Sequence, residues 1–530
     1  MTNRAYKTGI SREQPSFLPP RIEDYVAPAN MVRAIDAFVT GLRLEAFGFR
    51  NSGYEGGAGQ PPYDPADLLR LYLYGYLNRI RSSRRLAQEA GRNVELMWLL
   101  KRLTPGYRTI AKFRKDNWAA LKGVNRDFVM VLREAALMSA ELVGIDGAFF
   151  DGDASKGSIK TRKRLAGELA ALDREIEEYG RALESNDAAE ARDAPPEGGA
   201  EGGEDIGAKV AALMEERARR QAELAQLEQS GQSQVSTTDA DARLLSKRGQ
   251  VVAGYNVQVA VDEKHKLIVA SEVVNDGNDT GQLYRMAKAA KEALGTEALT
   301  VVADGGYYNG PELKACEEDG ITAYVPIPER TERLAAQGRF THADFVYEAA
   351  ADVYRCPAGA LLRPTQSPKI NNGRREIVYL SRKSDCTACP LRARCLAPRG
   401  LTRTIYRWEH EAVIERHRLR MAEGATQMRR RACLAEHPFG TLKCRAGYRH
   451  FLVRGLDQVN GEWSLMALCY NFTRVLNILG FEAFMEWARK RANCAFLSAV
   501  ALFKALIGSR RATVARFWAV PLRCRLAIAR

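Results

Sequence analysis

Residues 301–307 read VVADGGY, a short apolar run that ends in Asp304 and is followed by two glycines. An apolar run of this length bounded by glycine predicts a buried strand. Residues 143–147, VGIDG, repeat the pattern around Asp146. Each strand would deliver one carboxylate to the rim of a sheet. The chain is therefore predicted to be an α/β protein with acidic residues at the ends of two strands.

A third acid, Glu436, opens the stretch EHPFGTLK at residues 436–443, in a basic region of helical character. Carboxylates that meet in space need cations between them, and hard oxygen ligands suit Mg²⁺. Two such ions about 4 Å apart activate a nucleophile and stabilise the leaving oxygen of a phosphodiester. Taken alone, an aspartate before glycine is more often a turn residue. Together, the three acids predict that Asp146, Asp304 and Glu436 are catalytic residues that share one metal site.

The three motifs, in this order, resemble those of insertion-sequence DDE transposases, in particular the group named for insertion sequence eleven-eighty-two. The resemblance covers about residues 15 to 480. It implies an RNase H-like mixed-sheet catalytic core in which the acids hold two Mg²⁺ ions, with Mn²⁺ as a substitute. It also implies double-stranded DNA as the partner, both transposon ends and target, and a homodimer on the DNA, because two ends must be paired.

The resemblance also assigns phosphate-binding residues around Glu436. Lys443 fits the family's spacing of Tyr, Arg, Glu and Lys, but Arg429 stands where tyrosine is expected and Ala432 where arginine is. Arg431 lies one position away from the arginine position. In a helix, residues seven apart turn through about 700°, so Arg429, Glu436 and Lys443 would share one face. We expect Arg431, Lys443 and Arg429 to bind phosphates.

Several features bear on the choice of acids. Pro438 predicts a kink or a helix boundary just after Glu436. Ala148 stands where the family often has Thr or Ser after Asp-Gly, so a hydroxyl is missing beside Asp146. Glu462, at the start of an amphipathic helix, is the alternative third acid. The other nearby acids rank lower or are explained by turn and capping roles: Asp151, Asp153, Asp262, Asp276 and Asp279.

Charge agrees with a nucleic-acid partner. The chain has 79 Lys and Arg against 64 Asp and Glu, which gives a net charge of +15. An excess of positive charge favours polyanions, although a generally basic surface is the simpler alternative. No apolar run approaches the roughly 20 residues of a membrane span, and no secretory leader is recognisable, so we expect a cytoplasmic protein that joins the nucleoid when bound to DNA.

The 530 residues and their 46% hydrophobic content are enough for three or four domains. We predict an all-α DNA-binding domain at the N-terminus and a catalytic core in two parts. A helical and acidic insertion, a cysteine-containing insertion and a basic tail complete the chain. The predicted boundaries are 1–135 for the DNA-binding domain, 136–330 for the first part of the core with its insertion at 160–230, 331–406 for the cysteine-containing insertion, 407–480 for the final core helices and 481–530 for the tail.

Residues 82–114 resemble a helix-turn-helix arrangement with basic residues on its helices. Such helices meet DNA through phosphates and the major groove. An ordinary helical bundle with a solvated basic face is the alternative. The residues expected to contact DNA are Arg84, Arg85, Arg108, Lys112 and Arg114.

The insertion after the first strand has Leu and Ile at helical spacing in residues 160–183 and 207–230, around an acidic tip. This pattern predicts a helical hairpin that contacts a second protomer or acts as a spacer. Strand signals resume at 251–262 and 267–274, which predict a hairpin, and again at 299–303 and 321–327.

Four cysteines fall within forty residues of the second insertion. Zinc needs four soft ligands held tetrahedrally, and a CxxC turn supplies two of them. Reduced thiols without metal are the alternative, and an iron–sulfur cluster would use the same ligands. The candidate structural Zn²⁺ ligands are Cys356, Cys386, Cys389 and Cys395.

These features predict a DNA transposase that cleaves insertion-sequence ends and transfers the strand to target DNA by two-metal phosphoryl transfer. One ion would activate water and later a 3′-hydroxyl, and the other would stabilise the leaving oxygen. The alternatives are a nuclease of the same fold that cuts without joining, and a catalytically inactive DNA-binding relative.

Overall fold

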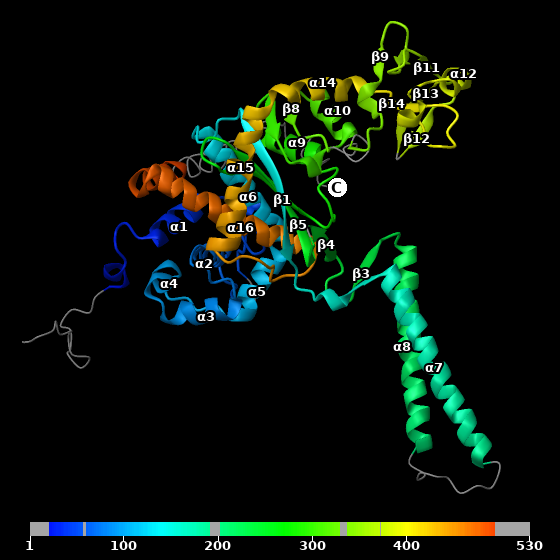
Figure 1. Cartoon of the computed structure of the whole chain (residues 1–530). Coiled ribbons are helices and arrows are strands. Elements are labelled where there is room, and N and C mark those ends of the chain that lie inside the picture. The colour runs from blue at the N-terminus through cyan, green and yellow to red at the C-terminus, as the bar shows by residue number, and fades with distance from the viewer. Residues whose placement is uncertain are drawn as a thin grey trace, which may run out of the picture.

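The computed structural model describes residues 21–56, 60–190, 202–247, 249–328, 336–371 and 373–492. In chain order they form a helical N-terminal part, a central mixed sheet interrupted by a long helical arm, a second sheet and a set of C-terminal helices (Figure 1). Most of the predicted basic tail, residues 493–530, lies outside the described residues, as do residues 191–201 at the tip of the arm.

The N-terminal helices pack around one central helix, α2 (Pro65–Leu77), which is buried on nearly all sides. Proline at the first helical position and the carboxylate of Asp64, which accepts a hydrogen bond from the Ala66 amide at 2.7 Å, fix where α2 begins. Ser82 and Asn93 cap the next two helices in the same way. The helices around α2 are α1 (Met31–Thr40), α3 (Ser83–Arg92), α4 (Val94–Leu99), α5 (Tyr107–Asp116) and α6 (Trp118–Glu134).

The central sheet has the strand order β4–β5–β1–β7–β8, with β6 also paired to β5. β1 runs parallel to β7, and β7 parallel to β8, while β5 is antiparallel to β1. The predicted hairpin is confirmed as β5 and β6, which pair antiparallel. The strand predicted at 321–327 is shorter, because it ends at Tyr324. The strands are β1 (Leu142–Asp151), β4 (Arg243–Lys247), β5 (Gln250–Asp262), β6 (Ile268–Val274), β7 (Leu299–Val302) and β8 (Ile321–Tyr324).

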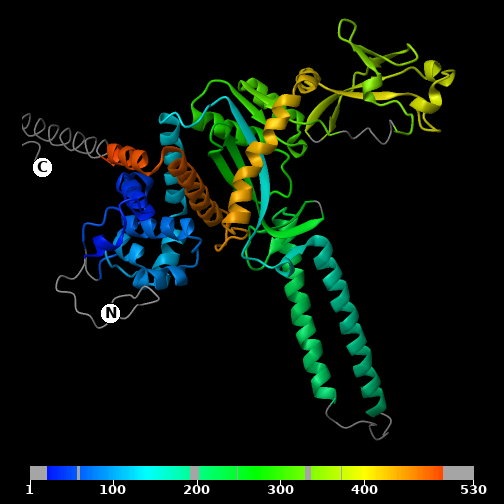
Figure 2. The same cartoon turned by 60° about the vertical axis from the view of Figure 1, so that its left-hand side comes forward.

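Helices cover the sheet and join it to the N-terminal part. α9 (Leu283–Leu294) packs on β1, β5 and β6, and α15 (Ala425–Phe439) packs on β1, β5 and β7. α15 lies across β1 in both views (Figures 1 and 2). α16 (Leu456–Leu479), buried along most of its length, contacts both β6 and the N-terminal helices α2 and α6. The N-terminal helices and the sheet therefore share one continuous hydrophobic core.

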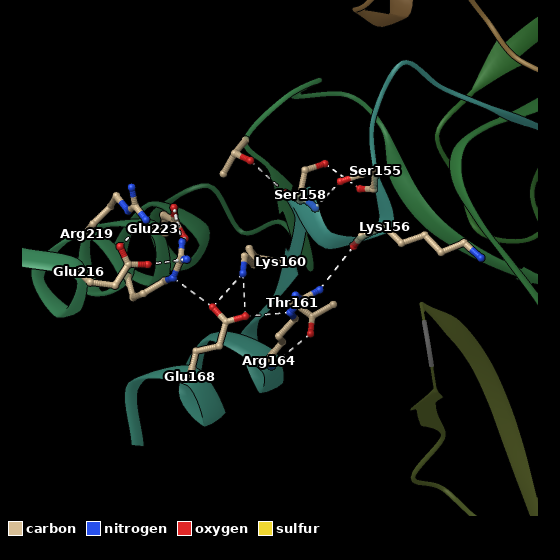
Figure 3. A network of polar contacts seen from close by, with 12 residues as sticks. Ser155, Lys156, Ser158, Lys160, Thr161, Arg164, Glu168, Glu216, Arg219 and Glu223 are labelled. Carbon is tan, nitrogen blue, oxygen red and sulfur yellow. Dashed lines mark hydrogen bonds and ion pairs between the residues drawn. The ribbon is translucent and has the colours of Figure 1, made fainter. Parts of the chain in front are cut away.

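The predicted helical hairpin is confirmed as α7 (Arg162–Glu190) and α8 (Gly202–Gln229), which project away from the rest of the molecule (Figure 2). A small sheet of β2 (Ile159–Thr161) and β3 (Gln234–Ser236) forms the base of this arm. There Glu168 accepts hydrogen bonds from Lys160 Nζ at 2.7 Å and Arg164 Nε at 2.9 Å (Figure 3). Burial opposes ionisation of Glu168, but these donors hold the pKa of its carboxyl below the ordinary value.

The second sheet was not predicted as strands. Its core consists of aromatic and apolar side chains, among them Tyr354, Leu362 and Tyr379, and two short helices that carry cysteines lie beside it. α14 (Glu411–Glu423) leads from this sheet back to the central one. The elements of the second sheet are β9 (Val346–Glu348), β10 (Val353–Arg355), β11 (Leu361–Pro364), β12 (Lys369–Asn371), β13 (Arg374–Leu380) and β14 (Thr404–Trp408), with α12 (Lys383–Thr387) and α13 (Arg392–Cys395).

Candidate active site

Asp146, in the middle of β1, lies level with Asp304, which follows the end of the adjacent parallel strand β7 by two residues. The register of β1 and β7 pairs Gly144 with Val302, and each aspartate follows two residues later. Because side chains alternate along a strand, both aspartates continue the same face of the sheet. The Asp304 carboxylate accepts a hydrogen bond from the Gly306 amide at 2.8 Å, and the Asp146 carboxylate accepts one from the Gly147 amide at 2.9 Å. Two of the three predicted acids are therefore brought together at the rim of the sheet.

Glu436 lies on α15, the helix that packs on this face. Leu434 of α15 is buried against Leu142 and Val302, which orients the helix on β1 and β7. Glu436 follows Leu434 by two residues, a turn of about 200° around the helix, and its side chain is exposed. Throughout the part of the chain that the structure describes, no group of three or more His, Cys, Asp or Glu side chains is arranged to hold a metal ion. The structure does not bring Glu436 together with the two aspartates.

Basic residues also lie on α15 and in the turn that follows it, next to β1. Lys443 lies in a π-helical turn, Gly440–Arg445, and its Nζ donates to the backbone oxygen of Phe149 at 2.6 Å. The same ammonium lies 4.3 Å from the centre of the Phe150 ring. Lys443 therefore lies beside the second half of β1, beyond Asp146, which lies in the middle of this strand and not at its end as predicted. Of the predicted phosphate contacts on α15, Arg429 is exposed and Arg431 is partly buried.

The helix boundary predicted just after Glu436 lies a few residues further on in the structure. α15 continues through Pro438 and ends at Phe439, where the π-helical turn begins. Proline lacks a backbone donor, so the hydrogen-bond pattern must change near it. The change of helix type lies between Glu436 and Lys443, so the 700° argument for a shared face does not hold across it.

A buried polar network lies on the opposite face of β1 and was missed by the sequence analysis. Asp279 Oδ1 accepts hydrogen bonds from Asn256 Nδ2 at 2.9 Å and from Gln258 Nε2 at 2.8 Å. The Tyr307 hydroxyl donates to Gln258 Oε1. Asp279 had been explained as a turn or capping residue, because its partners on β5 are more than twenty positions away in the sequence and no local pattern reveals them.

The charges that act on Tyr307 indicate that this network lies next to the two aspartates. Burial raises the pKa of the Tyr307 hydroxyl well above its ordinary value, and the negative charges of Asp279, Asp146 and Asp304 raise it further. Tyr307 therefore stays protonated and serves as a hydrogen-bond donor. The carboxylates of Asp279, Asp146 and Asp304 thus all lie close enough to the Tyr307 hydroxyl to raise its pKa.

Glu462, the alternative third acid, lies elsewhere. It is fully buried between α16 and the N-terminal helices. Its Oε1 accepts a hydrogen bond from the Tyr76 hydroxyl at 2.8 Å and lies 3.4 Å from Arg114 Nη1 and 3.7 Å from Arg81 Nη1. Its Oε2 accepts a hydrogen bond from the Leu452 amide at 2.8 Å. These contacts give Glu462 a structural role between two parts of the fold.

The same ion pair corrects one predicted DNA contact. The Arg114 side chain is only 7% exposed and points at Glu462, so it is not available to a phosphate. The other four predicted DNA contacts are exposed on α3 and α5. The Arg84 and Arg108 guanidinium groups lie 5.4 Å and 5.8 Å from the Tyr107 ring centre, so cations and an aromatic ring gather there. The four exposed residues are Arg84, Arg85, Arg108 and Lys112.

The four cysteines of the second insertion line one cavity of about 290 Å³ beside the second sheet. Burial raises the pKa of the Cys395 thiol, while the charge of Arg403 lowers it. All four are free thiols and partly buried. The four cysteines converge on one cavity, as predicted. Among the described residues, however, no group of side chains that includes them is arranged to hold a metal ion. The four cysteines are Cys356, Cys386, Cys389 and Cys395.

Two family models match the chain. A transposase DDE domain matches residues 355–476, which include Glu436 and Lys443, and a transposase domain (DUF772) matches residues 20–116. Asp146 and Asp304 lie outside both ranges. A transposase DDE domain implies, in general, a nucleotidyl-transfer enzyme that has DNA as its partner. More particularly, both matches are consistent with an insertion-sequence DDE transposase, and they confirm the resemblance predicted from the motifs.

No curated protein and no solved structure matches the chain. Within the described ranges, no helix combines the length and the apolar character that crossing a membrane requires.

Proposed function

We propose that the protein is a transposase that binds insertion-sequence ends, cleaves a DNA strand there and transfers it to target DNA, acting as a homodimer on paired ends. One observation carries the proposal: Asp146 on β1 lies level with Asp304, just past the end of the parallel strand β7, in a chain that matches transposase domains on either side of them. The strand order, with β1 central, β5 antiparallel to it and β7 parallel, supports an RNase H-like core.

Divalent cations, Mg²⁺ or Mn²⁺, would neutralise the phosphate and promote attack first by water and then by a 3′-hydroxyl. Carboxylate oxygens are the donors such ions prefer. Asp146 and Asp304 would hold them at the rim of the sheet, and Glu436 would be the third acid, contributed from α15. Arg429 and Arg431 on α15, and Lys443 in the π-helical turn that follows it, would hold phosphates of the DNA. The exposed residues of α3 and α5 would bind the element end.

The test uses a labelled duplex that carries the inverted repeats flanking the gene, incubated with the purified protein and Mg²⁺. A nicked product that then becomes joined to a second duplex supports the transposase. Nicking without joining indicates a nuclease of the same fold. Binding without any cleavage indicates an inactive relative.

Replacing Arg84 and Arg108 together by glutamine is expected to weaken binding of the duplex by about tenfold at 0.1 M salt. The slope of log affinity against log salt concentration should fall by about two, because each lost phosphate contact removes about one unit. Filter binding or fluorescence anisotropy over a salt series measures both. Arg174→Gln, an exposed arginine on the arm, is the control. An unchanged salt slope in the double variant would remove α3 and α5 from the DNA interface.

Zinc in the cysteine cavity stays a prediction. Structural zinc would need the four sulfurs about 2.3 Å from the metal, so the cavity would have to contract around it. The purified protein is expected to contain about one zinc ion per chain, and the Cys386→Ser, Cys389→Ser variant to contain none. Elemental analysis of dialysed protein decides the question. Metal-free wild type, with two more titratable thiols than the Cys386→Ser, Cys389→Ser variant, would show that these cysteines are reduced residues without metal.

A further inference from the structure

The register of β1 and β5 determines which side chains form the polar network beneath β1. β1 and β5 pair Gly147 with Gln258 and Phe149 with Asn256. Directly paired residues lie on the same face of a sheet, and this face alternates with the one that carries Asp146. Gln258 and Asn256 are both fully buried. Two amide side chains therefore lie on the face of β1 opposite to the first aspartate.

Asp279 fills the space next to Gly147. A Cβ atom at position 147 would lie 2.6 Å from Asp279 Oδ1, 2.5 Å from Gln258 Nε2 and 3.0 Å from the Tyr307 hydroxyl. These distances are shorter than van der Waals contact, so only glycine fits. The β1 backbone therefore rests directly on the network, one residue after Asp146.

The other carboxylate oxygen of Asp279, Oδ2, lies near Gly306 in the turn that follows β7. A Cβ at Gly306 would lie 3.6 Å from Asp279 Oδ2 and 2.9 Å from Asp304 Oδ1. The Thr280 hydroxyl also donates to the Gly306 backbone oxygen at 3.4 Å. Asp279 thus lies between the backbone beside Asp146 and the turn that holds Asp304, and Tyr307 closes the network from that turn.

We propose that Asp279 is a positioning residue that fixes the backbone beside Asp146 and the turn at Asp304 relative to one another. This role rests on the proposed function, since it matters for catalysis only if the two aspartates act on one phosphodiester. The residue acts through its Oδ1, which accepts two amide donors, and not through its charge. Partners that orient the residues around a metal typically change affinity or activity by about 10- to 100-fold when removed.

The test compares Asp279→Ala with Asp279→Asn in the full-length protein. An asparagine keeps an oxygen that can accept from Asn256 and Gln258, whereas alanine removes it. We expect Asp279→Ala to lower the cleavage rate at saturating DNA by about tenfold or more and to weaken Mn²⁺ binding by about tenfold. DNA affinity should stay within about twofold, and Asp279→Asn should recover both readouts to within about threefold of wild type. The matched control is Asp276→Asn, an exposed aspartate in the same loop.

Calorimetric titration with Mn²⁺ provides a readout that does not depend on transposition. Suppose that wild type binds Mn²⁺, that Asp304→Asn does not, and that wild type cuts no DNA. The proposed function then fails, but the Mn²⁺ affinities of the Asp279 variants still decide the positioning role. If Asp279→Ala cleaves and binds Mn²⁺ as wild type does, the inference is overturned. If Asp279→Asn is as impaired as Asp279→Ala, the charge is what matters and the positioning role is also overturned.

A folding defect in Asp279→Ala would not leave the question open. Tyr307→Phe keeps the ring and removes only the hydroxyl that donates to Gln258. It is expected to keep the wild-type melting temperature within a few degrees and to weaken Mn²⁺ binding and cleavage by several-fold in parallel. Unchanged values in this variant would overturn the role of the network.

Discussion

Asp304→Asn is expected to lower strand cleavage and joining by about 10³-fold or more while leaving DNA binding intact. Charge stabilisation by a metal site contributes several kcal/mol to such reactions, and each 1.36 kcal/mol is a factor of ten. Asparagine keeps the side-chain oxygen that accepts from the Gly306 amide, so the turn should be preserved. Single-turnover cleavage of the labelled duplex measures the rate, and anisotropy measures the affinity.

Asp153→Asn is the matched control for this variant. Asp153 follows the same strand β1, is half exposed and forms an ion pair with Arg454 at 2.8 Å. An exposed pair of this kind contributes little to stability, and its loss should change cleavage by less than about twofold. Equal loss of activity in both variants would mean that general acidity near β1 matters, and not the pair of level carboxylates.

Strands β1 and β7 could be predicted because their signal is local. An apolar run that ends in Asp-Gly marks β1 and β7 without reference to any other part of the chain, and the two helices of the arm follow from their leucine spacing. The second sheet could not be predicted in this way. Its strands are three to seven residues long and several are largely exposed, as in β12, so no regular alternation distinguishes them from loops.

The parts of the site that depend on distant partners were missed or misassigned. Arg114 has the sequence surroundings of a DNA contact, but its face of α5 meets Glu462, which is 348 positions away. Asp279 has the surroundings of a turn, but it is held by two amides from β5. In both cases the role is set by tertiary packing, which a single sequence does not encode in any local pattern.

Glu462→Ala is expected to destabilise the contact between α16 and the N-terminal helices by about 3–5 kcal/mol. Removing one member of a buried ion pair leaves the other charge without compensation, and this costs far more than the pair contributes when intact. Here Arg114 would be left buried, and the Tyr76 hydroxyl and the Leu452 amide would lose their acceptor. Hydrogen exchange of the α2 and α16 amides measures the local free energy of unfolding.

Glu436→Gln supplies the comparison that separates the two glutamates. Glu436 is exposed on α15, so this change should alter stability by less than about 0.5 kcal/mol. If it abolishes cleavage at unchanged stability, α15 contributes the third acid, and its exposed position means that the helix or the side chain must move toward the aspartates once DNA and metal are bound. If Glu436→Gln cleaves normally, Glu462 is still a poor replacement, because its carboxylate is already held by two arginines, a tyrosine and a backbone amide. The third acid would then have to be sought among other side chains near Asp146 and Asp304, because Asp279 is already held by two buried amides.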